Sequence, residues 1–464
     1  PMPAALEAYL DPRSCPAERP SLAILSPSTR KLHQEIDDAA RRLGRPYLHP
    51  EGPSIQLDML GSRQMARWQE AKAQRVMLGT GAWSELEQFY ARYGVESTRA
   101  LIAEVKALER AEGAILTDCG MGAVALVFDV LARPGGHAVL ARGVYNKTKR
   151  YAEWLGGRFP FAVTLVDDGD QAGIESAIRP ETALLFLETY SNPLTRAVDP
   201  ARLGETAARA RSAGARRLRV AIDDTIATPW GLKRPLLTFP GIDIVLASGT
   251  KALAGQDRDL WGYLASNRID FLNGAMDLVA MRGGCLDWRR SEEILAGLPS
   301  ARERFHRRSA SARAVAAFLA SHPQVDEVQH PSLPDHPDRK AVEEHYTLPG
   351  SLIAFRVRGC DEEGARRFAD VLATCVVPRY AGSFDGLTTK INHHKSVSEY
   401  FTSEEELRRA GIDRVLRLGV GIEEPRDLIA CLNWALWHHR STSVEAVERW
   451  QDERRRATEG GDGT

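Results

Sequence analysis

Short apolar segments alternate with longer amphipathic stretches from about residue 85 to residue 250. The stretches between the apolar segments are long enough to hold crossover helices. This alternation is typical of a mostly parallel sheet with helices on both faces. The strands of this sheet are predicted at residues 114–117, 137–141, 162–166, 183–187, 218–222 and 242–247.

The pattern changes near Arg304. A long amphipathic helix is predicted over residues 305–321, followed by a strand at 351–357 and a helix at 362–372. The sequence therefore predicts an N-terminal arm, a large ligand-binding domain and a smaller C-terminal α/β domain. A tail rich in Arg and Gly follows, predicted as a frayed helix and a disordered end. The predicted bounds of these parts are residues 1–84, 85–304, 305–445 and 446–464.

The composition is that of an ordinary globular protein. The 464 residues include 61 Lys and Arg against 62 Asp and Glu, for a net charge of -1. Such a chain has no overall attraction to nucleic acid or anionic lipid, so neither partner is predicted. No apolar run is long enough to cross a bilayer and residues 1–20 lack a secretory pattern, which favours a cytoplasmic protein. The six scattered cysteines form no C-x-x-C pair, so no metal site and no disulfide framework is predicted.

Candidate chemistry is sought at the carboxyl ends of the strands, because ligands of open α/β sheets bind there. The first strand is followed by Asp118-Cys119-Gly120-Met121-Gly122 and then by a predicted helix. Its two glycines allow backbone N–H groups to converge at the start of the helix, which is the geometry of a phosphate site. A tight turn without a ligand is the alternative.

Two later strand ends carry ionisable side chains. The strand at 218–222 is followed by Asp223 and Asp224, which could bind a metal, act as acid or base, bind a cationic ring nitrogen or cap a helix. The strand at 242–247 is followed by Ser248-Gly249-Thr250-Lys251. A Lys that emerges from a buried strand into the ligand crevice, unlike a surface Lys, can form a Schiff base.

The remaining strand ends supply Tyr145, whose ring could stack on a heteroaromatic ligand, and Asn192, whose amide could bind a ring oxygen. Each residue alone has an ordinary structural explanation, in packing or in a turn. Together with the glycine turn, the Asp and the Lys, they match the needs of a single cofactor. That cofactor carries a phosphate, a pyridine ring and an aldehyde.

These motifs resemble those of the Cys/Met metabolism enzymes that depend on pyridoxal phosphate, the group of cystathionine γ-synthase, cystathionine γ-lyase and methionine γ-lyase. The resemblance runs from about residue 90 to residue 436. It implies fold type I, an α/β fold with a mostly parallel seven-stranded sheet and a smaller C-terminal α/β domain. The family's Ser-x-Thr-Lys segment corresponds to Ser248-Gly249-Thr250-Lys251, and its Val-Asp-Asn-Thr segment to Ile222-Asp223-Asp224-Thr225.

The resemblance also implies a role for each of these residues. Lys251 forms the aldimine with pyridoxal 5'-phosphate, and Asp223 binds the pyridine nitrogen. The other cofactor contacts come from two phosphate-binding turns, a stacking Tyr and the Asn of an Asn-Pro segment. In this sequence those residues are Gly120, Met121, Ser248, Thr250, Tyr145 and Asn192.

Further matches concern the substrate and the subunit interface. Tyr90 and Arg92 resemble a Tyr and an Arg that reach the cofactor phosphate of the neighbouring subunit in this family. They imply a homo-oligomer, a dimer or a tetramer with shared active sites. Arg417 resembles the Arg that grips the substrate α-carboxylate, and Ser383 begins a loop that flanks this carboxylate.

Several positions depart from the family pattern where the substrate is selected. The Tyr that follows the family's Lys is Ala252, and a later His-Ser-Asp is Gln256-Asp257-Arg258. The loop at 383–388 also differs, and Ala296 stands where an Arg-Gly-Leu segment of the family has its Arg. These departures indicate a specialised amino-acid substrate rather than cystathionine or methionine. Neutral drift in a housekeeping enzyme is the alternative.

The resemblance predicts γ-elimination or γ-replacement on an amino acid with a γ-leaving group, through a vinylglycine-type intermediate. The predicted catalytic residues are Lys251, which moves the Cα proton, Asp223, which keeps the ring nitrogen protonated, and Tyr145, which assists as acid or base. Three alternatives stay open: β-elimination within the same family, transamination by a fold type I enzyme, and a cofactor-binding protein without catalysis.

Overall fold

The computed structural model describes residues 62–73, 90–254, 258–375 and 377–459, together with isolated positions before residue 62. The chain divides into two compact units, one made of residues 1–100 and 287–289, the other of residues 101–286 and 290–464. Most of the predicted N-terminal arm, and Gln256 and Asp257, lie outside the described residues. The predicted domain bounds stay a prediction.

The first unit contains helix α3 (Ser62–Ala71) and the short 3-10 helix η4 (Ala91–Tyr93). Trp68 of α3 is buried, and its ring packs edge-on against Tyr93 at 5.6 Å between centroids. This aromatic contact is the packing that joins α3 to η4 within the unit.

Within the described part of the second unit, seven strands form a sheet in the order β1-β7-β6-β5-β4-β2-β3. All pairs are parallel except those of β7, which runs antiparallel to β1 and to β6. The predicted mostly parallel sheet is confirmed. The sequence pattern does not predict β7, because this strand follows the Lys251 turn without an intervening helix. The strands are β1 (Gly113–Thr117), β2 (Gly136–Ala141), β3 (Phe161–Val166), β4 (Thr182–Glu188), β5 (Arg219–Asp223), β6 (Ile244–Ala247) and β7 (Gly262–Ser266).

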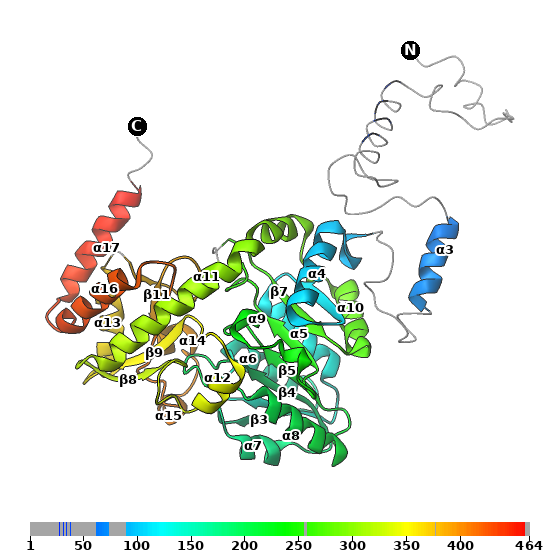
Figure 1. The fold of residues 1–464 in the computed structure, drawn as a ribbon, viewed down its shortest axis with the longest axis horizontal. Coiled ribbons are helices and arrows are strands. Elements are labelled where there is room, and N and C mark those ends of the chain that lie inside the picture. The colour runs from blue at the N-terminus through cyan, green and yellow to red at the C-terminus, as the bar shows by residue number, and fades with distance from the viewer. Residues whose placement is uncertain are drawn as a thin grey trace. The chain divides into compact units, whose positions relative to one another are not determined.

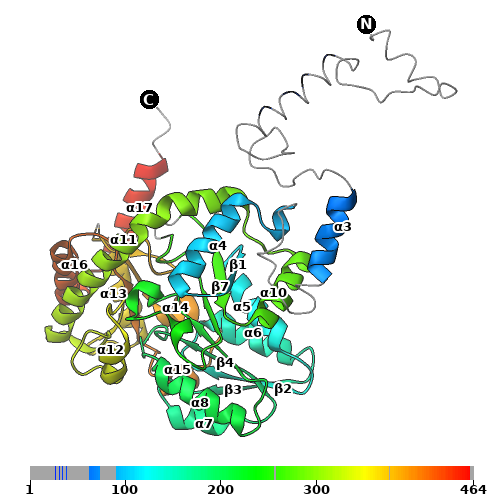
Figure 2. The same ribbon diagram turned by 45° about the vertical axis from the view of Figure 1, so that its right-hand side comes forward.

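Helices cover both faces of this sheet. Crossovers between parallel strands are right-handed, so connections that run in opposite directions along the sheet lie on opposite faces. The chain moves outward from β1 to β3 and returns from β3 to β6. Helices α5 and α6 therefore cover one face and α7 and α8 the other, as Figures 1 and 2 show. The helices of this region are α4 (Glu96–Glu109), α5 (Gly120–Leu131), α6 (Asn146–Gly156), α7 (Gln171–Ala177), α8 (Pro200–Ser212), α9 (Thr228–Gly231), the 3-10 helix η5 (Leu236–Thr238) and α10 (Ile269–Arg282).

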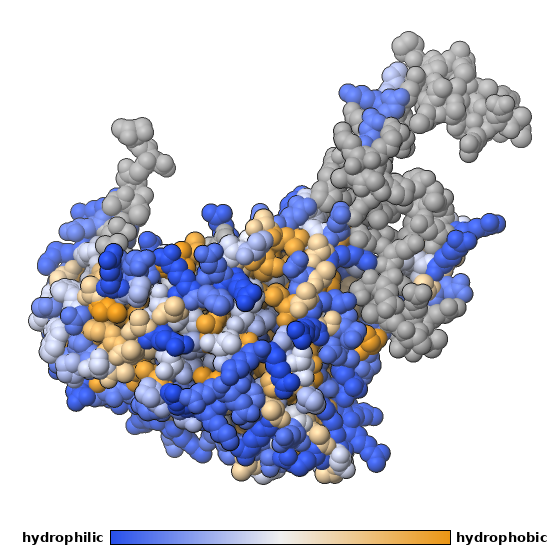
Figure 3. Space-filling model, viewed as in Figure 1, coloured by the Kyte–Doolittle hydropathy of each residue, from blue (hydrophilic) through white to orange (hydrophobic). Residues whose placement is uncertain are grey.

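The two-sided cover explains why the strands are apolar throughout. Strands β1, β2, β4 and β6 are buried along their whole length, whereas β3 at the sheet edge is only partly buried. A parallel sheet with helices on both faces needs continuous apolar runs rather than alternating ones. The outer surface differs from these buried strands, since hydrophilic residues cover most of the face seen in Figure 3.

A second sheet follows in the C-terminal half of this unit. Among the described residues it has five strands in the order β10-β11-β12-β9-β8, and only the β10–β11 pair is parallel. A separate cluster of buried apolar side chains, including Phe355 and Phe368, packs beneath it. Its strands are β8 (Val325–Gln329), β9 (Leu352–Val357), β10 (Arg379–Tyr380), β11 (Lys390–His393) and β12 (Leu416–Gly419). The accompanying helices are α11 (Trp288–Ser321), α12 (Arg339–His345), α13 (Glu362–Ala373), α14 (His394–Ser398), α15 (Glu404–Arg409) and α16 (Pro425–His438).

The predicted tail begins with a helix. Residues 446–459 belong to α17 (Val444–Glu459), where the sequence predicts a frayed helix, and residues 460–464 lie outside the described residues. The hydroxyl of Ser443 accepts a hydrogen bond from the Ala446 N–H (3.2 Å), and Arg455 pairs with Asp452 at i,i+3 (3.1 Å). A capping hydroxyl and a run of Glu, Arg and Gln, which are good helix formers, favour the helix over a disordered end. No described helix is long and apolar enough to cross a membrane.

A buried carboxyl makes stability depend on pH. Glu109 at the end of α4 is fully buried and accepts a hydrogen bond from the Tyr263 hydroxyl (2.6 Å). Burial raises the pKa of Glu109 from 4.5 to about 7, although this hydrogen bond lowers it. Below pH 4.5 the group is protonated in both the folded and the unfolded chain. Between pH 4.5 and 7 only the unfolded chain releases the proton, so the fold loses stability as the pH rises through this range.

Replacing Glu109 by Gln should remove this loss, because an amide of the same size does not ionise. We expect the free energy of unfolding of the wild-type protein to fall relative to Glu109→Gln by roughly 2 kcal/mol between pH 5 and pH 8. Denaturant unfolding at both pH values measures the difference. Glu104→Gln, at an exposed site on the same helix, is the control and should follow the wild type. Parallel pH profiles for wild type and Glu109→Gln would contradict the assignment.

Candidate active site

A cavity of about 350 Å³ opens at the carboxyl ends of the parallel strands. It lies between the seven-stranded sheet and the loop that precedes β11, and both belong to the second unit. The cavity brings together most of the site residues predicted from the sequence. Those on its wall are Gly120, Met121, Tyr145, Asn192, Asp223, Ser248, Thr250, Lys251, Ser383 and Arg417.

Strand pairing brings three of the polar groups side by side. Strands β4 and β5 pair so that Glu188 lies opposite Asp223, and β5 pairs with β6, which Ser248 follows directly. Adjacent parallel strands end at the same edge of a sheet, so side chains far apart in the sequence converge there. Thr225 connects two of them: its hydroxyl bonds the Asp223 carboxylate (2.5 Å) and accepts from the Ser248 N–H (2.8 Å).

One end of the cavity is formed by the start of α5. A Cβ on Gly120 would lie 2.6 Å from the Cβ of Ser248, so only glycine lets these two turns approach so closely. The Cys119 sulfur caps the helix by accepting from the Gly122 N–H (3.3 Å). The Ser248 hydroxyl has no hydrogen-bond partner within the described ranges. Helix N–H groups and a free hydroxyl are donors that suit an anion.

Thr250 lies on the same wall, but its hydroxyl is already engaged. It accepts from the Trp261 N–H (2.9 Å) and donates to the Trp261 carbonyl (3.1 Å). This pair of bonds fixes the turn that leads from Ser248 to Lys251. Thr250 therefore shapes the anion-binding end and has less hydrogen-bonding capacity to offer than Ser248.

The carboxyls at the strand ends lie in a desolvated setting. Burial raises the pKa of Asp223 to about 6, although the hydroxyl and N–H of Thr225 lower it. Burial also raises the pKa of Glu188 well above its usual value, and the Asp223 charge raises it further. Glu188 accepts the backbone N–H of Tyr145 (2.6 Å). An added cation would stabilise ionised Asp223, because an opposite charge favours the ionised form of a buried acid.

Lys251 extends from the turn after β6 across the cavity. Its ammonium donates to the Ser383 hydroxyl (2.6 Å) and lies 5.3 Å from the centroid of the Phe384 ring. Both contacts come from the loop before β11, so the two sheets of the unit approach each other at this amine. The predicted Lys and the predicted Ser383 are therefore in direct contact.

Arg417 enters the cavity from the middle of β12. The side chain is buried, its Nη1 donates to the Asn192 side-chain oxygen (3.2 Å), and its Nε has no hydrogen-bond partner within the described ranges. Burial lowers the pKa of its guanidinium to about 10, so it remains charged near neutral pH. A buried charge with an unused donor requires an anionic partner, and a carboxylate matches the planar guanidinium.

Tyr145 stands at the start of α6 and is 40% exposed, so its ring is available on the cavity wall. Tyr90 and Arg92 lie in the other compact unit, where the Arg92 guanidinium is 4.6 Å from the centroid of the Tyr90 ring. The structure does not place these two residues at the cavity, so their predicted role stays a prediction.

Comparison with known proteins shows the family of the chain. Residues 69–437 match the Cys/Met metabolism PLP-dependent enzyme family. The chain belongs to this family. It is 33% identical to an O-succinylhomoserine sulfhydrylase of Pseudomonas aeruginosa over 342 residues. The aligned region covers 74% of this chain and 81% of that protein. It is 32% identical to an L-methionine gamma-lyase of Pseudomonas deceptionensis over 77% of this chain and 87% of that protein.

The fold agrees with this family membership. A solved cystathionine gamma lyase from Micromonospora echinospora matches with a TM-score of 0.69 and 30% identity, over 76% of this chain and 89% of that structure. The predicted fold type I architecture and the predicted dependence on pyridoxal phosphate are thus confirmed.

The residues on the cavity wall fit pyridoxal phosphate. The glycine-lined start of α5 and the Ser248 hydroxyl offer donors for the phosphate. Asp223 is buried and has no cationic partner in the described part of the chain, so it suits a protonated ring nitrogen, and the Lys251 amine suits an aldehyde. Arg417, whose Nε has no partner within the described ranges, suits a carboxylate.

Sequence reasoning did not single out several residues of the site. The roles of Glu188 and Phe384 are set by tertiary contacts, although both lie in segments that the family resemblance marks. His394 of α14 is buried and neither ring nitrogen has a hydrogen-bond partner within the described ranges. Burial, and then the charge of Arg417, lower its pKa well below 6.5, so a neutral imidazole lies near the guanidinium. No sequence signal distinguishes His394 from an ordinary core histidine.

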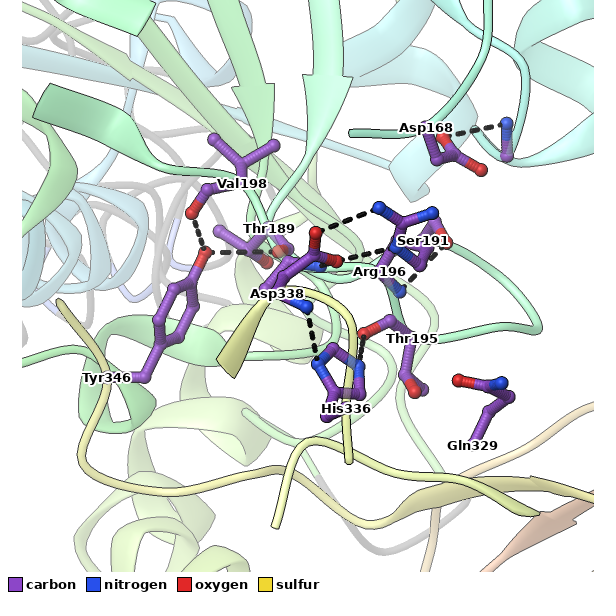
Figure 4. Close-up of polar contacts among 12 residues, drawn as sticks. Asp168, Thr189, Ser191, Thr195, Arg196, Val198, Gln329, His336, Asp338 and Tyr346 are labelled. Carbon is purple, nitrogen blue, oxygen red and sulfur yellow. Dashed lines mark hydrogen bonds and ion pairs between the residues drawn. The ribbon is translucent and has the colours of Figure 1, made fainter. Parts of the chain in front are cut away.

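The loop that carries Asn192 is held by residues from the C-terminal part of the unit. The Asp338 carboxylate accepts two hydrogen bonds from the Arg196 guanidinium (2.6 and 2.9 Å) and one from the Ala197 N–H (2.9 Å). Figure 4 shows this pair at the centre of the network. A bidentate charge pair with a further backbone bond fixes both the position and the direction of a loop.

Two more side chains bind the backbone of the same loop. A ring nitrogen of His336 bonds the Thr195 carbonyl (3.1 Å), and the Tyr346 hydroxyl contacts the carbonyls of Thr189 (3.1 Å) and Val198 (2.8 Å) (Figure 4). The loop from β4 to α8 is thus bonded along its length to the segment between β8 and β9.

Another support holds the loop before β11. Arg308 of α11 is fully buried, forms an ion pair with Asp385 and donates to the Gly386 carbonyl (3.2 Å). Asp385 itself has a positive φ of 74°. The ion pair fixes the loop on which Ser383 and Phe384 face Lys251.

Replacing Asp338 by Asn should loosen the Asn192 loop, because the amide has one acceptor oxygen and no charge. We expect pyridoxal phosphate to bind this variant about 3- to 10-fold more weakly, with the fold retained. Titration of the cofactor-free protein, followed by absorbance, measures the dissociation constant. Asp335→Asn, at an exposed site in the same segment, should bind like the wild type. Equal affinities for all three proteins would show that the network does not support the cofactor site.

Proposed function

We propose that this PLP-dependent enzyme catalyses γ-elimination or γ-replacement on an amino acid that carries a γ-leaving group. The convergence of Asp223, Lys251 and Arg417 on one cavity carries the proposal. The names of the relatives, a sulfhydrylase and two gamma-lyases, support γ chemistry over the β-elimination and transamination that the sequence left open.

Each residue has a defined task in this proposal. Pyridoxal phosphate, when bound, supplies an electron sink for the bond that breaks at the substrate Cα. When pyridoxal phosphate is bound, the Lys251 amine would hold its aldehyde, and the free Nζ would accept the Cα proton of the substrate. Ser383, 2.6 Å from this nitrogen, orients it. The Asp223 carboxylate keeps the ring nitrogen protonated and so preserves the electron sink.

Arg417 and Tyr145 determine which bond reacts. Arg417 would bind the α-carboxylate through its Nε, which has no partner within the described ranges, and would so orient the substrate. Tyr145, partly exposed on the wall, would contact the cofactor ring and serve as the acid or base when the γ-group leaves. The departures from the family pattern support a specialised substrate.

We also propose that the active unit is a homo-oligomer, a dimer or a tetramer, in which Tyr90 and Arg92 of one subunit reach the phosphate of the next. The motif around these residues supports the proposal. The cytoplasmic location stays a prediction.

The central test is turnover with and without Lys251. Purified protein with pyridoxal phosphate should release the γ-group from at least one γ-substituted amino acid. Elimination would also yield a 2-oxo acid and ammonia, whereas replacement would yield an amino acid that carries an added nucleophile at Cγ. Lys251→Ala should lower kcat by at least about 100-fold, because it removes both the covalent anchor and the proton carrier. Lys233→Ala, at an exposed site away from the cavity, should keep full activity. Turnover that survives in Lys251→Ala would overturn the assignment.

Shared active sites predict complementation between two inactive variants. Arg92→Gln and Lys251→Ala should each be inactive alone. After subunits are exchanged in an equal mixture, about one quarter of the wild-type activity should return, because half of the dimers then contain one complete site. If no activity returns although the subunits have exchanged, Arg92 does not act across the interface. Labelled subunits and native mass spectrometry verify the exchange.

A further inference from the structure

Lys147 lies on the wall of the same cavity as Lys251 and Arg417. It is the second residue of α6, two positions after Tyr145, where the family's Tyr-Gly-Gly-Thr segment has glycine. A glycine in that place adds no side chain, whereas this chain brings an ammonium into the cavity. None of the tasks in the proposed reaction uses this group.

Lys147 differs from its neighbours on α6 in its charge partners among the described residues. Helix α6 carries three cations, and the other two have carboxylate partners: Lys149 pairs with Glu399 (3.5 Å) and Arg150 with Glu153 (3.3 Å). Lys147 has no carboxylate partner in the described part of the chain. Its hydrogen bond goes to a neutral group, the Tyr400 hydroxyl (3.2 Å).

Two aromatic rings hold the ammonium in place. It lies 5.4 Å from the ring centroid of Tyr400 and 5.1 Å from that of Phe401, and these two rings pack edge-on at 5.1 Å. Aromatic rings attract a cation without cancelling its charge. Tyr400 lies on the cavity wall as well, so its hydroxyl is a second donor beside the ammonium.

The two carboxyls on the cavity wall, Glu188 and Asp223, bond to groups other than the Lys147 ammonium. Glu188 receives the Tyr145 N–H, and Asp223 is bonded by Thr225, both at the strand ends. The cavity wall carries three basic side chains, Lys147, Lys251 and Arg417. The proposed reaction assigns Lys251 to the cofactor and Arg417 to the α-carboxylate, so Lys147 remains for the far end of a substrate.

We propose that Lys147, assisted by the Tyr400 hydroxyl, is a specificity-determining residue that selects amino acids whose side chain ends in an anion, a carboxylate in the first place. The proposal deepens the proposed function, on which it rests: Arg417 binds the α-carboxylate, and Lys147 binds the far end of the substituent on Cγ. Amino acids with a neutral side chain would leave the ammonium without a counter-ion.

Binding of unreactive amino acids tests this selection without turnover. L-2-aminoadipate and L-norleucine have six carbons each and differ at the end of the chain, which is a carboxylate in one and a methyl group in the other. We expect the wild-type holoenzyme to bind aminoadipate about tenfold more tightly than norleucine by calorimetry. Lys147→Met, which keeps the length of the side chain without its charge, should bring this ratio close to one. Lys147→Arg should keep most of the preference.

Arg150→Met is the matched control. Arg150 lies on the same helix and over the same Phe401 ring (5.0 Å), but it is not on the wall of this cavity. Its replacement removes one positive charge from α6 and should leave the ratio unchanged. An equal loss in Arg150→Met and Lys147→Met would mean a general effect of charge. That result would overturn the proposal, as would a wild-type ratio near one or the absence of binding for both compounds.

A reactive pair separates this inference from the proposed function. O-succinyl-L-homoserine and O-acetyl-L-homoserine share the γ-ester, and only the first ends in a carboxylate. Lys147→Met should lower kcat/KM about tenfold for the succinyl ester and little for the acetyl ester. If neither ester reacts while the binding ratio behaves as expected, the γ chemistry is wrong and the selection stands. If both react at rates that do not depend on Lys147, the chemistry stands and the selection is wrong.

Discussion

The parallel pairing of β4, β5 and β6 is the constraint on which the site depends. It places Glu188 opposite Asp223 and sets Ser248 next to them, although these residues are separated by tens of positions in the sequence. Thr225 then bonds across this edge to both Asp223 and Ser248. A shift of one residue in this pairing would turn these side chains to the opposite face of the sheet. The apolar interiors of β4 and β6 protect the pairing because both strands are buried along their length.

Desolvation gives the converging groups their properties. Burial raises the pKa of Asp223 to about 6 and lowers that of Arg417 to about 10. Both groups are therefore costly to keep charged without a partner, and each is ready to pair with a ligand charge of opposite sign. In the proposed function, the partner of Asp223 is a cationic ring nitrogen and the partner of Arg417 is a carboxylate. His394 is buried and neutral, so its imidazole does not neutralise the Arg417 guanidinium. The charge of Arg417 can therefore attract an anion bound in the cavity.

The rest of the site lies on two loops, and ion pairs with residues far along the sequence fix the position of each loop. Asp338 fixes the Asn192 loop through Arg196, and the buried Arg308 fixes the Ser383 loop through Asp385. In both cases the supporting residue belongs to the C-terminal part of the second unit. The amine of Lys251 meets Ser383 and Phe384 at this junction, so chemistry at the sheet edge depends on packing in the other sheet.

The sequence by itself determined the order of strands and helices and the identity of the residues at the strand ends. Apolar runs of strand length are visible without a structure, and Lys251, Asp223 and the Gly120 turn follow them directly. The family resemblance added Arg417 and Ser383, which no strand pattern predicts. Sequence patterns failed at β7, which follows a turn rather than a helix.

Only the tertiary structure decided which side chains touch. The Lys251–Ser383 and Arg417–Asn192 contacts join residues 132 and 225 positions apart, and local propensities carry no information about such pairs. The same holds for Lys147, which looks like an ordinary helix-surface lysine until Tyr400 and Phe401 are placed beside it and its neighbours on α6 are seen to be paired. The burial of a side chain and the charges near it depend on its surroundings, and the fold alone creates those surroundings.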